Sequence, residues 1–235
     1  MKLSILIPVY NEEKMIDRIL AKVLELRQSS LFDSLEIIAV DDCSKDNSFN
    51  LLNEYAGKGE ITLARHSVNK GKGGVIKTAI ALSTGDYIVF QDADLEYDPQ
   101  DLLKMAEFVD KNGLKVLYGS RFSGKNTSPL GKFHYFVNAG LTTFSNFFTE
   151  LNLTDMETCY KMFHKDILKE IVIEENRFGI EPEITAKVAK LCKEKGYKIT
   201  EIPISYNPRN RGEGKKIGVK DGLRALYIIL KYGLF

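Results

Sequence analysis

The chain has 235 residues, of which 44% are hydrophobic and 28% are charged, a composition typical of one large globular domain with a substantial core. Its 33 Lys and Arg residues nearly balance its 32 Asp and Glu residues, so the net charge of +1 gives no indication of nucleic-acid binding. The charge is unevenly distributed, because residues 187–220 contain ten basic and three acidic side chains. This segment favours an anionic partner.

Three cysteines, Cys43, Cys159 and Cys192, lie far apart and in no Cys-x-x-Cys or Cys/His pattern. They predict neither a disulfide framework nor a zinc site, and we expect free thiols in a reducing cytosol. The first apolar run, in "MKLSILIPVYNEE", is too short for a signal peptide and predicts a strand. No stretch reaches the ~18 to 20 apolar residues of a membrane span, so we expect a soluble or peripheral protein.

Strands and helices are predicted to alternate along the first half of the chain. Apolar runs predict strands at residues 3–7, 35–40, 61–64, 86–91 and 114–118. Helical periodicity and capping residues predict helices between them, at residues 12–27, 49–55, 75–82 and 99–109. Strands separated by single helices imply an α/β fold with a mostly parallel central sheet and helices on both faces.

In such a sheet, ligands bind beyond the carboxyl ends of the strands. Polar and glycine-rich clusters follow each of the first four predicted strands: Pro8, Tyr10 and Glu12; Asp41 and Asp42; "NKGKGG" at residues 69–74; and Asp92, Ala93 and Asp94. These clusters are therefore expected at one edge of the sheet.

The sequence "VFQDADLEYD" at residues 89–98 places acids directly after a buried strand. If the segment continues extended, Asp92 and Asp94 point the same way and can share Mg²⁺ or Mn²⁺, which takes its remaining oxygens from a diphosphate. A solvated acidic turn matches the same short D-x-D pattern by chance. The preceding apolar strand favours the metal site.

The clusters after the second and third predicted strands give weaker evidence for a ligand site. Asp41 and Asp42 either cap the next helix or accept hydrogen bonds from a base or ribose. "NKGKGG" completes neither the Walker A pattern nor the dinucleotide fingerprint. It predicts only a glycine turn that lets the backbone approach a nucleotide.

The second half of the chain is less regular. Residues 133–148 place aromatic side chains near helical spacing, which predicts either a core helix or a helix lying in a membrane interface. The residues of this stripe are Phe133, Phe136, Phe144, Phe147 and Phe148. Together with the basic segment, they predict salt-sensitive binding to anionic liposomes.

Basic residues in the second half point to phosphate. "YNPRNRGEGKKI" carries Arg209, Arg211, Lys215 and Lys216 among glycines. This pattern predicts either a solvated basic face or a clamp over an anionic substrate. Arg121 follows the fifth predicted strand, near the same edge as the acids. The three histidines, His66, His134 and His164, occur in no ligand spacing and are expected to be structural or exposed.

Several motifs together resemble a known family. "SILIPVYNEE", "EIIAVDDCSKDNS", "NKGKGG", "GDYIVFQDADLEYDP" and "GSRF" resemble the GT-A family 2 glycosyltransferases. "LTDMETCYKMF", "FGIEPEITAKV", "EIPISYNPRNRGEGKKI" and "DGLRAL" are similar to the branch of dolichyl- or polyprenyl-phosphate hexose synthases.

The resemblance covers nearly the whole chain. It implies one GT-A domain over residues 1–235, with a nucleotide-sugar-binding half at 1–120 and an acceptor-binding half at 121–235 that ends in an amphipathic helix. It also implies inverting, metal-dependent transfer of a hexose from UDP-glucose or GDP-mannose to a polyprenyl or dolichyl phosphate. The expected location is peripheral, at the cytoplasmic face of a membrane.

The resemblance assigns roles position by position. The positions that would hold the nucleoside are Pro8, Tyr10, Glu12 and Asp42, with Lys72 nearby. Asp92, Ala93 and Asp94 match the element for donor and metal, and Glu96 stands where this branch often has Gln. Arg121 matches the arginine near the acceptor phosphate, while Arg209 and Lys215 match the basic closing loop. Independently of the resemblance, Asp155 in "TDMET" is expected to be a base or an orienting residue, or else a helix cap.

Two departures bear on the identity of the sugar. The loop reads "GEGKK" where mannosyl members often have Ser before the Lys. Lys132 or His134 stands where a second acceptor arginine is expected.

Two other functions fit the same motifs. A family 2 enzyme that glycosylates a saccharide hydroxyl would need a carboxylate base near the acceptor, whereas an ionised phosphate needs none. A non-catalytic nucleotide-sugar-binding protein would be expected to lose one acid of the D-x-D element, and both acids are present.

Overall fold

The strand β1 (Lys2–Val9) lies inside the sheet and is buried along most of its length. The computed structural model describes residues 1–123, 132–208 and 219–234. In it, β1 pairs in parallel with β2 (Ser34–Asp41) and β4 (Tyr87–Phe90), and β2 pairs in parallel with β3 (Thr62–Arg65). The nearly continuous apolar sequence of β1 fits a strand that is covered on both faces.

The predicted helices of the first half are present, with shifted ends. They are α1 (Ile16–Glu25), which continues as a 3₁₀ turn (Leu26–Gln28), α2 (Ser48–Gly57), α3 (Lys72–Leu82) and α4 (Asp101–Asn112). Helix α1 begins later than expected, because residues 12–15 form a turn in which the Glu12 carbonyl accepts hydrogen bonds from the amides of Met15 and Ile16. Helix α3 begins earlier, at Lys72.

The sheet contains seven strands in the order β3-β2-β1-β4-β6-β5-β7. The predicted fifth strand, β5 (Val116–Ser120), does not lie next to β4. Between them runs β6 (Lys161–His164), antiparallel to both, and β7 (Ile199–Pro203) pairs in parallel with β5 at the edge. The prediction of a mostly parallel sheet is confirmed, but the antiparallel insertion of β6 was not predicted.

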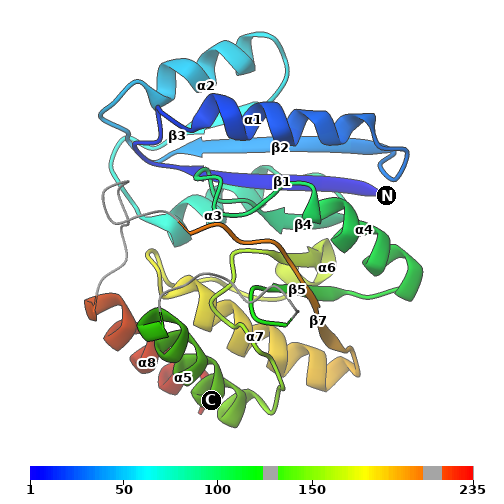
Figure 1. The fold of residues 1–235 in the computed structure, drawn as a ribbon, viewed down its shortest axis with the longest axis vertical. Helices are drawn as coiled ribbons and strands as arrows, with labels where there is room; N and C mark the ends of the chain where they lie inside the picture. The colour runs from blue at the N-terminus through cyan, green and yellow to red at the C-terminus, as the bar shows by residue number, and fades with distance from the viewer. Residues whose placement is uncertain (124–131, 209–218, 235) are drawn as a thin grey trace.

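The second half of the chain adds helices α5 (Lys132–Thr149), α6 (Lys165–Lys169), α7 (Ile180–Lys195) and α8 (Val219–Gly233). Figure 1 shows α5, α7 and α8 together at the end of the molecule opposite α1 and α2. A small second core lies between α5 and α8 and consists of Leu141, Met156, Ala225 and Ile229. Within the described residues, no helix combines the length and apolarity that crossing a bilayer requires.

The aromatic stripe of α5 is partly buried and partly exposed. Phe144 and Phe148 pack against the second core. Phe136 and Phe147 remain 68% and 78% exposed. The side chain of Phe133 lies outside the described part of the chain.

Candidate active site

The loops after β1 and β2 hold each other at the carboxyl edge of the sheet. Asn11, in the left-handed region with φ of 53°, donates its amide to Ser44 Oγ at 3.0 Å and accepts the Lys45 amide on Oδ1 at 2.8 Å. The Glu12 amide donates to Ser48 Oγ at 2.8 Å. These contacts place Pro8, Tyr10 and Glu12 beside the Asp42 loop, as the positions of both clusters after predicted strands indicated.

The carboxylate of Asp42 is engaged within the protein. It is buried, lies 2.7 Å from Nδ1 of His66, and accepts the amides of Lys70 at 2.8 Å and Gly71 at 2.7 Å. On its other side, His66 Nε2 lies 2.9 Å from the hydroxyl of Thr78. Asp42 therefore fixes the start of the glycine loop, residues 69–74.

The neighbouring acid, Asp41, has one carboxylate oxygen without a hydrogen-bond partner among the described residues. Oδ2 of Asp41 pairs with Arg65 Nε at 3.2 Å and accepts the Ser44 amide at 3.2 Å. Its Oδ1 is buried and has no hydrogen-bond partner in the part of the chain that the structure describes. Of the two acids, Asp41 thus retains an acceptor oxygen without a partner among the described residues.

The glycine loop packs against residues 174–177. A Cβ atom at Gly73 would lie 2.2 Å from the Glu175 carbonyl oxygen, and one at Gly71 would lie 2.6 Å from the Asn176 carbonyl oxygen. The Gly74 amide donates to that same Asn176 carbonyl at 3.1 Å. The backbone that approaches these glycines is therefore that of residues 175 and 176, where we expected a nucleotide.

Lys72 connects this loop to the D-x-D element. Its Nζ lies 2.9 Å from Asp92 Oδ1 and 3.2 Å from Glu181 Oε1, and Glu181 also pairs with the buried Lys161. Burial alone would lower the pKa of Lys72, but the carboxylate of Asp92 and the charge of Glu181 raise it well above its usual value. Burial would likewise raise the pKa of Asp92, and Lys72 lowers it. Both groups are therefore charged.

The D-x-D turn keeps its carboxylates within reach of a ligand. The Asp92 side chain is 24% exposed, and Ala93 between the two acids is buried. Asp94 Oδ1 accepts the Glu96 amide at 3.1 Å across Leu95, which has a φ of 59°. This turn fixes the direction of the Asp94 carboxylate.

The acids of this turn fit a metal that is held jointly with a substrate. Among the described residues, no group of three or more His, Cys, Asp or Glu side chains could hold an ion by itself. Mg²⁺ typically takes one or two carboxylates and completes its shell with water and substrate phosphates. Asp92 and Asp94 therefore fit a cation that arrives with a diphosphate.

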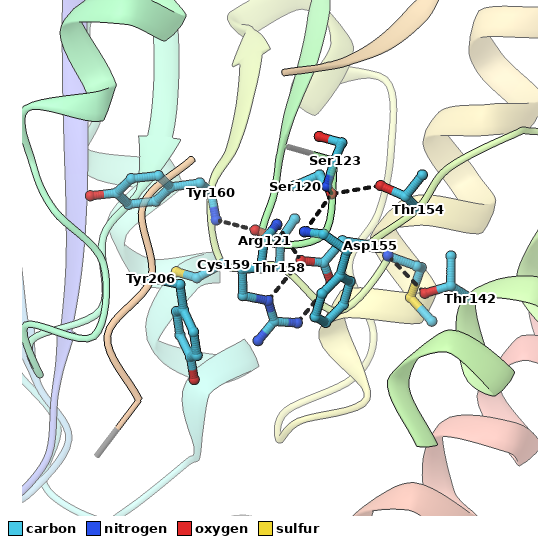
Figure 2. Close-up of polar contacts among 12 residues, drawn as sticks. Ser120, Arg121, Ser123, Thr142, Thr154, Asp155, Thr158, Cys159, Tyr160 and Tyr206 are labelled. Carbon is cyan, nitrogen blue, oxygen red and sulfur yellow. Dashed lines mark hydrogen bonds and ion pairs between the residues drawn. The ribbon is translucent and has the colours of Figure 1, made fainter. Parts of the chain in front are cut away.

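Arg121 and Asp155 form a buried pair next to this site (Figure 2). Arg121 donates from Nε to Asp155 Oδ2 and from Nη2 to Oδ1, each at 2.7 Å, and its amide donates to Oδ2 at 3.0 Å. The guanidinium carbon lies 5.4 Å and 5.1 Å from the ring centres of Phe122 and Tyr206. Since both Asp155 oxygens are bonded to Arg121, the geometry supports the orienting role for Asp155 over the role of base or helix cap.

Tyr206 links three parts of the site. Its hydroxyl donates to Glu96, its ring packs against Tyr97 and Arg121, and the amide of the next residue, Asn207, donates to the Glu96 carbonyl at 2.8 Å. Glu96 therefore joins the D-x-D turn to the start of the basic loop. The basic residues assigned to that loop, Arg209, Arg211, Lys215 and Lys216, lie outside the described residues.

Sequence reasoning missed four residues at this site: Glu157, Lys161, Glu181 and Tyr206. Lys161 and Glu181 gave a usable signal, because each is a charged residue in an apolar stretch that becomes buried. Glu157 gave none, since "TDMETCY" has the composition of a polar turn. Its Oε1 is buried without a hydrogen-bond partner among the described residues, and burial together with the charge of Glu181 raises the pKa of Glu157 to about 7.

Comparison with known proteins gives the family. Residues 4–172 match the model of "Glycosyl transferase family 2". A dolichol-phosphate mannosyltransferase of Pyrococcus furiosus is 26% identical over 99% of this chain and 64% of its own length. A dolichyl-phosphate beta-glucosyltransferase of Dictyostelium discoideum is 28% identical over 87% of this chain and 66% of its own length. The chain thus spans just under two thirds of these relatives.

Solved structures give the fold. Glucosyl-3-phosphoglycerate synthase from Mycobacterium tuberculosis, in complex with Mn²⁺, UDP and phosphoglyceric acid, superposes with a TM-score of 0.73 at 16% identity, over 99% of this chain and 78% of that one. TarS of S. aureus in complex with UDP-GlcNAc gives 0.66 at 20% identity, over 99% and 66%. The architecture is the GT-A fold that the sequence motifs predicted, and the chain is a glycosyltransferase of family 2.

Proposed function

We propose that this glycosyltransferase transfers a hexose, with inversion, from UDP-glucose or GDP-mannose to a polyprenyl or dolichyl phosphate. Two relatives that match most of the chain are named for dolichol or dolichyl phosphate. The family and the fold support a nucleotide-sugar donor, since similar structures hold UDP or UDP-GlcNAc.

The observation that carries the acceptor proposal is the pair of Arg121 and Asp155. A saccharide hydroxyl needs a base, whereas a phosphate monoester is already ionised at neutral pH. Asp155 would have to release Arg121 before it could accept a proton, because Arg121 donates to both of its oxygens. A fixed arginine whose Nη1 takes no part in this pair suits an anionic acceptor.

The residues of the site divide the work of the reaction. Asp92 and Asp94 hold the donor diphosphate together with Mg²⁺ or Mn²⁺, whose charge offsets the negative charge that grows on the departing nucleoside diphosphate. Arg121 orients the acceptor phosphate, one oxygen of which attacks C1 of the hexose as the bond from C1 to the diphosphate oxygen breaks. Pro8, Tyr10 and Glu12 line the nucleoside side.

The experiment is a transfer assay with radiolabelled UDP-glucose and GDP-mannose, offered a polyprenyl phosphate or a saccharide. We expect transfer to the lipid phosphate from one of the two donors, with loss of turnover in Asp94→Asn and on addition of EDTA. Transfer that survives chelation would contradict the metal assignment. Transfer to the saccharide alone would contradict the acceptor assignment.

A second candidate function has one observation in its favour. Transfer to a saccharide hydroxyl requires a base poised near neutral pH, and the pKa of Glu157 is raised to about 7, first by burial and then by Glu181. The assay above separates the two acceptors directly.

We also propose that the enzyme contacts the cytoplasmic face of a membrane through α5 and α8. Exposed apolar side chains lie on these neighbouring helices: Phe136, Phe147, Leu223, Leu226 and Tyr227. The basic segment, residues 187–220, adds electrostatic attraction to anionic lipid.

Co-sedimentation with vesicles that contain phosphatidylglycerol tests this contact. We expect the double variant Phe136→Ser, Phe147→Ser to bind less, and added salt to weaken wild-type binding. Val172→Ser removes an exposed apolar side chain that lies on neither helix and should bind as wild type does. Equal binding by all three proteins would exclude these helices as the contact surface.

A further inference from the structure

Oε1 of Glu157, a shielded carboxylate oxygen on the Arg121 side of the site, lacks, in the described part of the chain, the partner that the neighbouring carboxylates have. Asp155 is paired with Arg121, Asp92 with Lys72, and Glu181 with both Lys161 and Lys72. Oε1 of Glu157 is shielded from solvent, and within the described residues it has no hydrogen-bond partner. A buried polar atom without a partner is unfavourable by about 1 to 3 kcal/mol, so it is expected to have one when the enzyme works.

Glu157 is joined along the chain to residues on both sides of the active site. It belongs to the segment between α5 and β6, two residues after Asp155, which holds the acceptor-side Arg121. It is also two residues before Cys159, whose thiol lies against the carboxylate of Asp92 on the donor side. The charged groups that act on Glu157 are Glu181, Lys161, Arg121 and Asp155, so all of them belong to the machinery of the site.

The chemistry of this position selects the missing partner. An acceptor phosphate would be repelled by an ionised Glu157, and it has Arg121 as its own partner. A metal ion would lie close to the cations Arg121 and Lys161. A hydroxyl group satisfies a carboxyl oxygen in either protonation state, because it both donates and accepts a hydrogen bond.

We propose that Glu157 binds a hydroxyl group of the transferred hexose through Oε1 and thereby selects the sugar. This inference rests on the proposed function, in that the site must take a nucleotide sugar. The raised pKa of Glu157 agrees with it, since a group that titrates near neutral pH offers a sugar hydroxyl either a donor or an acceptor. A polar group built to bond one hydroxyl also discriminates strongly against sugars that lack it.

Binding measured by calorimetry without any acceptor tests the proposal. UDP and UDP-glucose, or GDP and GDP-mannose, are titrated into wild type, Glu157→Ala and Glu157→Gln. We expect the nucleoside diphosphate to bind all three equally. We expect Glu157→Ala to bind the nucleotide sugar about tenfold to a hundredfold more weakly, and Glu157→Gln to lose less, because it retains a donor and an acceptor.

Two further arms make the contact specific. Glu150→Ala removes an exposed carboxylate from the same segment between α5 and β6 and should leave both affinities unchanged. Monodeoxy analogues of the donor sugar should include one that binds wild type and Glu157→Ala with the same affinity, because the hydroxyl that Glu157 contacts is absent from it.

The outcomes separate this inference from the function on which it rests. If wild type binds neither nucleotide sugar, the proposed function fails and the inference fails with it. If wild type binds one and Glu157→Ala binds it equally well, only the inference is overturned. It is also overturned if both variants keep full sugar affinity but lose transfer to a saccharide, since Glu157 would then be the base.

Discussion

Arg121 carries its charge in a place where an unpaired guanidinium group would be strongly unfavourable. Its side chain is 8% exposed. The Asp155 side chain is 0% exposed and accepts hydrogen bonds from Arg121 on both carboxylate oxygens. Removing one partner of a buried ion pair costs about 3 to 5 kcal/mol, because the other charge is left uncompensated. The pair is therefore both a structural requirement and the means of aiming Arg121.

We accordingly expect Asp155→Ala to lower the free energy of unfolding by about 3 to 5 kcal/mol in urea denaturation. Glu150→Ala breaks the pair of Glu150 with Lys193, whose side chains are 69% and 67% exposed, and should cost less than about 1 kcal/mol. Equal losses in the two variants would show that the Asp155 pair is not buried in solution.

Glu157 predicts a specific dependence of stability on pH. Burial and the nearby charge of Glu181 raise its pKa from 4.5 to about 7 in the folded protein. Between these two values the folded state binds more protons than the unfolded state, so stability falls as the pH rises from about 4.5 to 7 and is level above that.

The total loss from this one group is on the order of 3 kcal/mol, at about 1.4 kcal/mol per pKa unit. Glu157→Gln cannot titrate, so its stability relative to wild type should rise across this window. Denaturant titrations of both proteins at pH 5 and pH 8 measure the difference. A constant difference between the two proteins would mean that the Glu157 carboxyl titrates as it does in water.

At the scale of elements, the glycine loop and residues 174–177 form a contact that depends on the absence of side chains. Gly73 leaves no room for a Cβ atom, which would lie 2.2 Å from the Glu175 carbonyl oxygen. Glu175 in turn pairs with Arg224 of α8 through both carboxylate oxygens, at 3.0 Å and 2.9 Å. The start of α3 is thus connected to α8 through one short segment.

Gly73→Ala should therefore lower the melting temperature. A loss of about 1 to 3 kcal/mol is typical of overpacking and corresponds to roughly 2 to 12 °C at this chain length. Gly140→Ala, inside α5 with no atom within 4 Å of the added Cβ, should be neutral or stabilising by up to about 1 kcal/mol. A Gly73→Ala protein with the same melting temperature as wild type would contradict the close approach of residues 174–177 to the glycine loop.

The elements that could be predicted from the sequence are those with a strong local signal. Apolar runs located β1, β2 and β4, and the strand-to-loop transitions located the acids at the carboxyl edge. The strand β6 has only four residues, "KMFH". Its place between β4 and β5 depends on pairing with strands that lie more than 40 residues earlier in the sequence. The partners of the site residues could not be predicted either, because they are also distant in sequence: Glu181 contacts Lys72 only in the folded protein.

At the scale of the whole molecule, the two predicted halves share one sheet. The strand β5 belongs to the first half, yet its neighbours β6 and β7 both come from the second. We expect a fragment of residues 1–120 to lack cooperative unfolding in circular dichroism, while the full chain unfolds in one transition. A fragment with a sharp transition of its own would show that β1 to β4 are sufficient.

This strand order also affects how the chain folds while it is being made. The strands β1 to β4 can pair as they leave the ribosome, but β5 must wait until β6 and β7 have been synthesised, near residue 203. At about 5 to 20 residues per second, this wait is on the order of 4 to 17 s. Until β6 is made, near residue 164, β4 presents an unpaired edge, and until β7 is made β5 presents one as well; unpaired edges favour aggregation. The yield of soluble protein should therefore depend on translation speed and on chaperones that cover these strands.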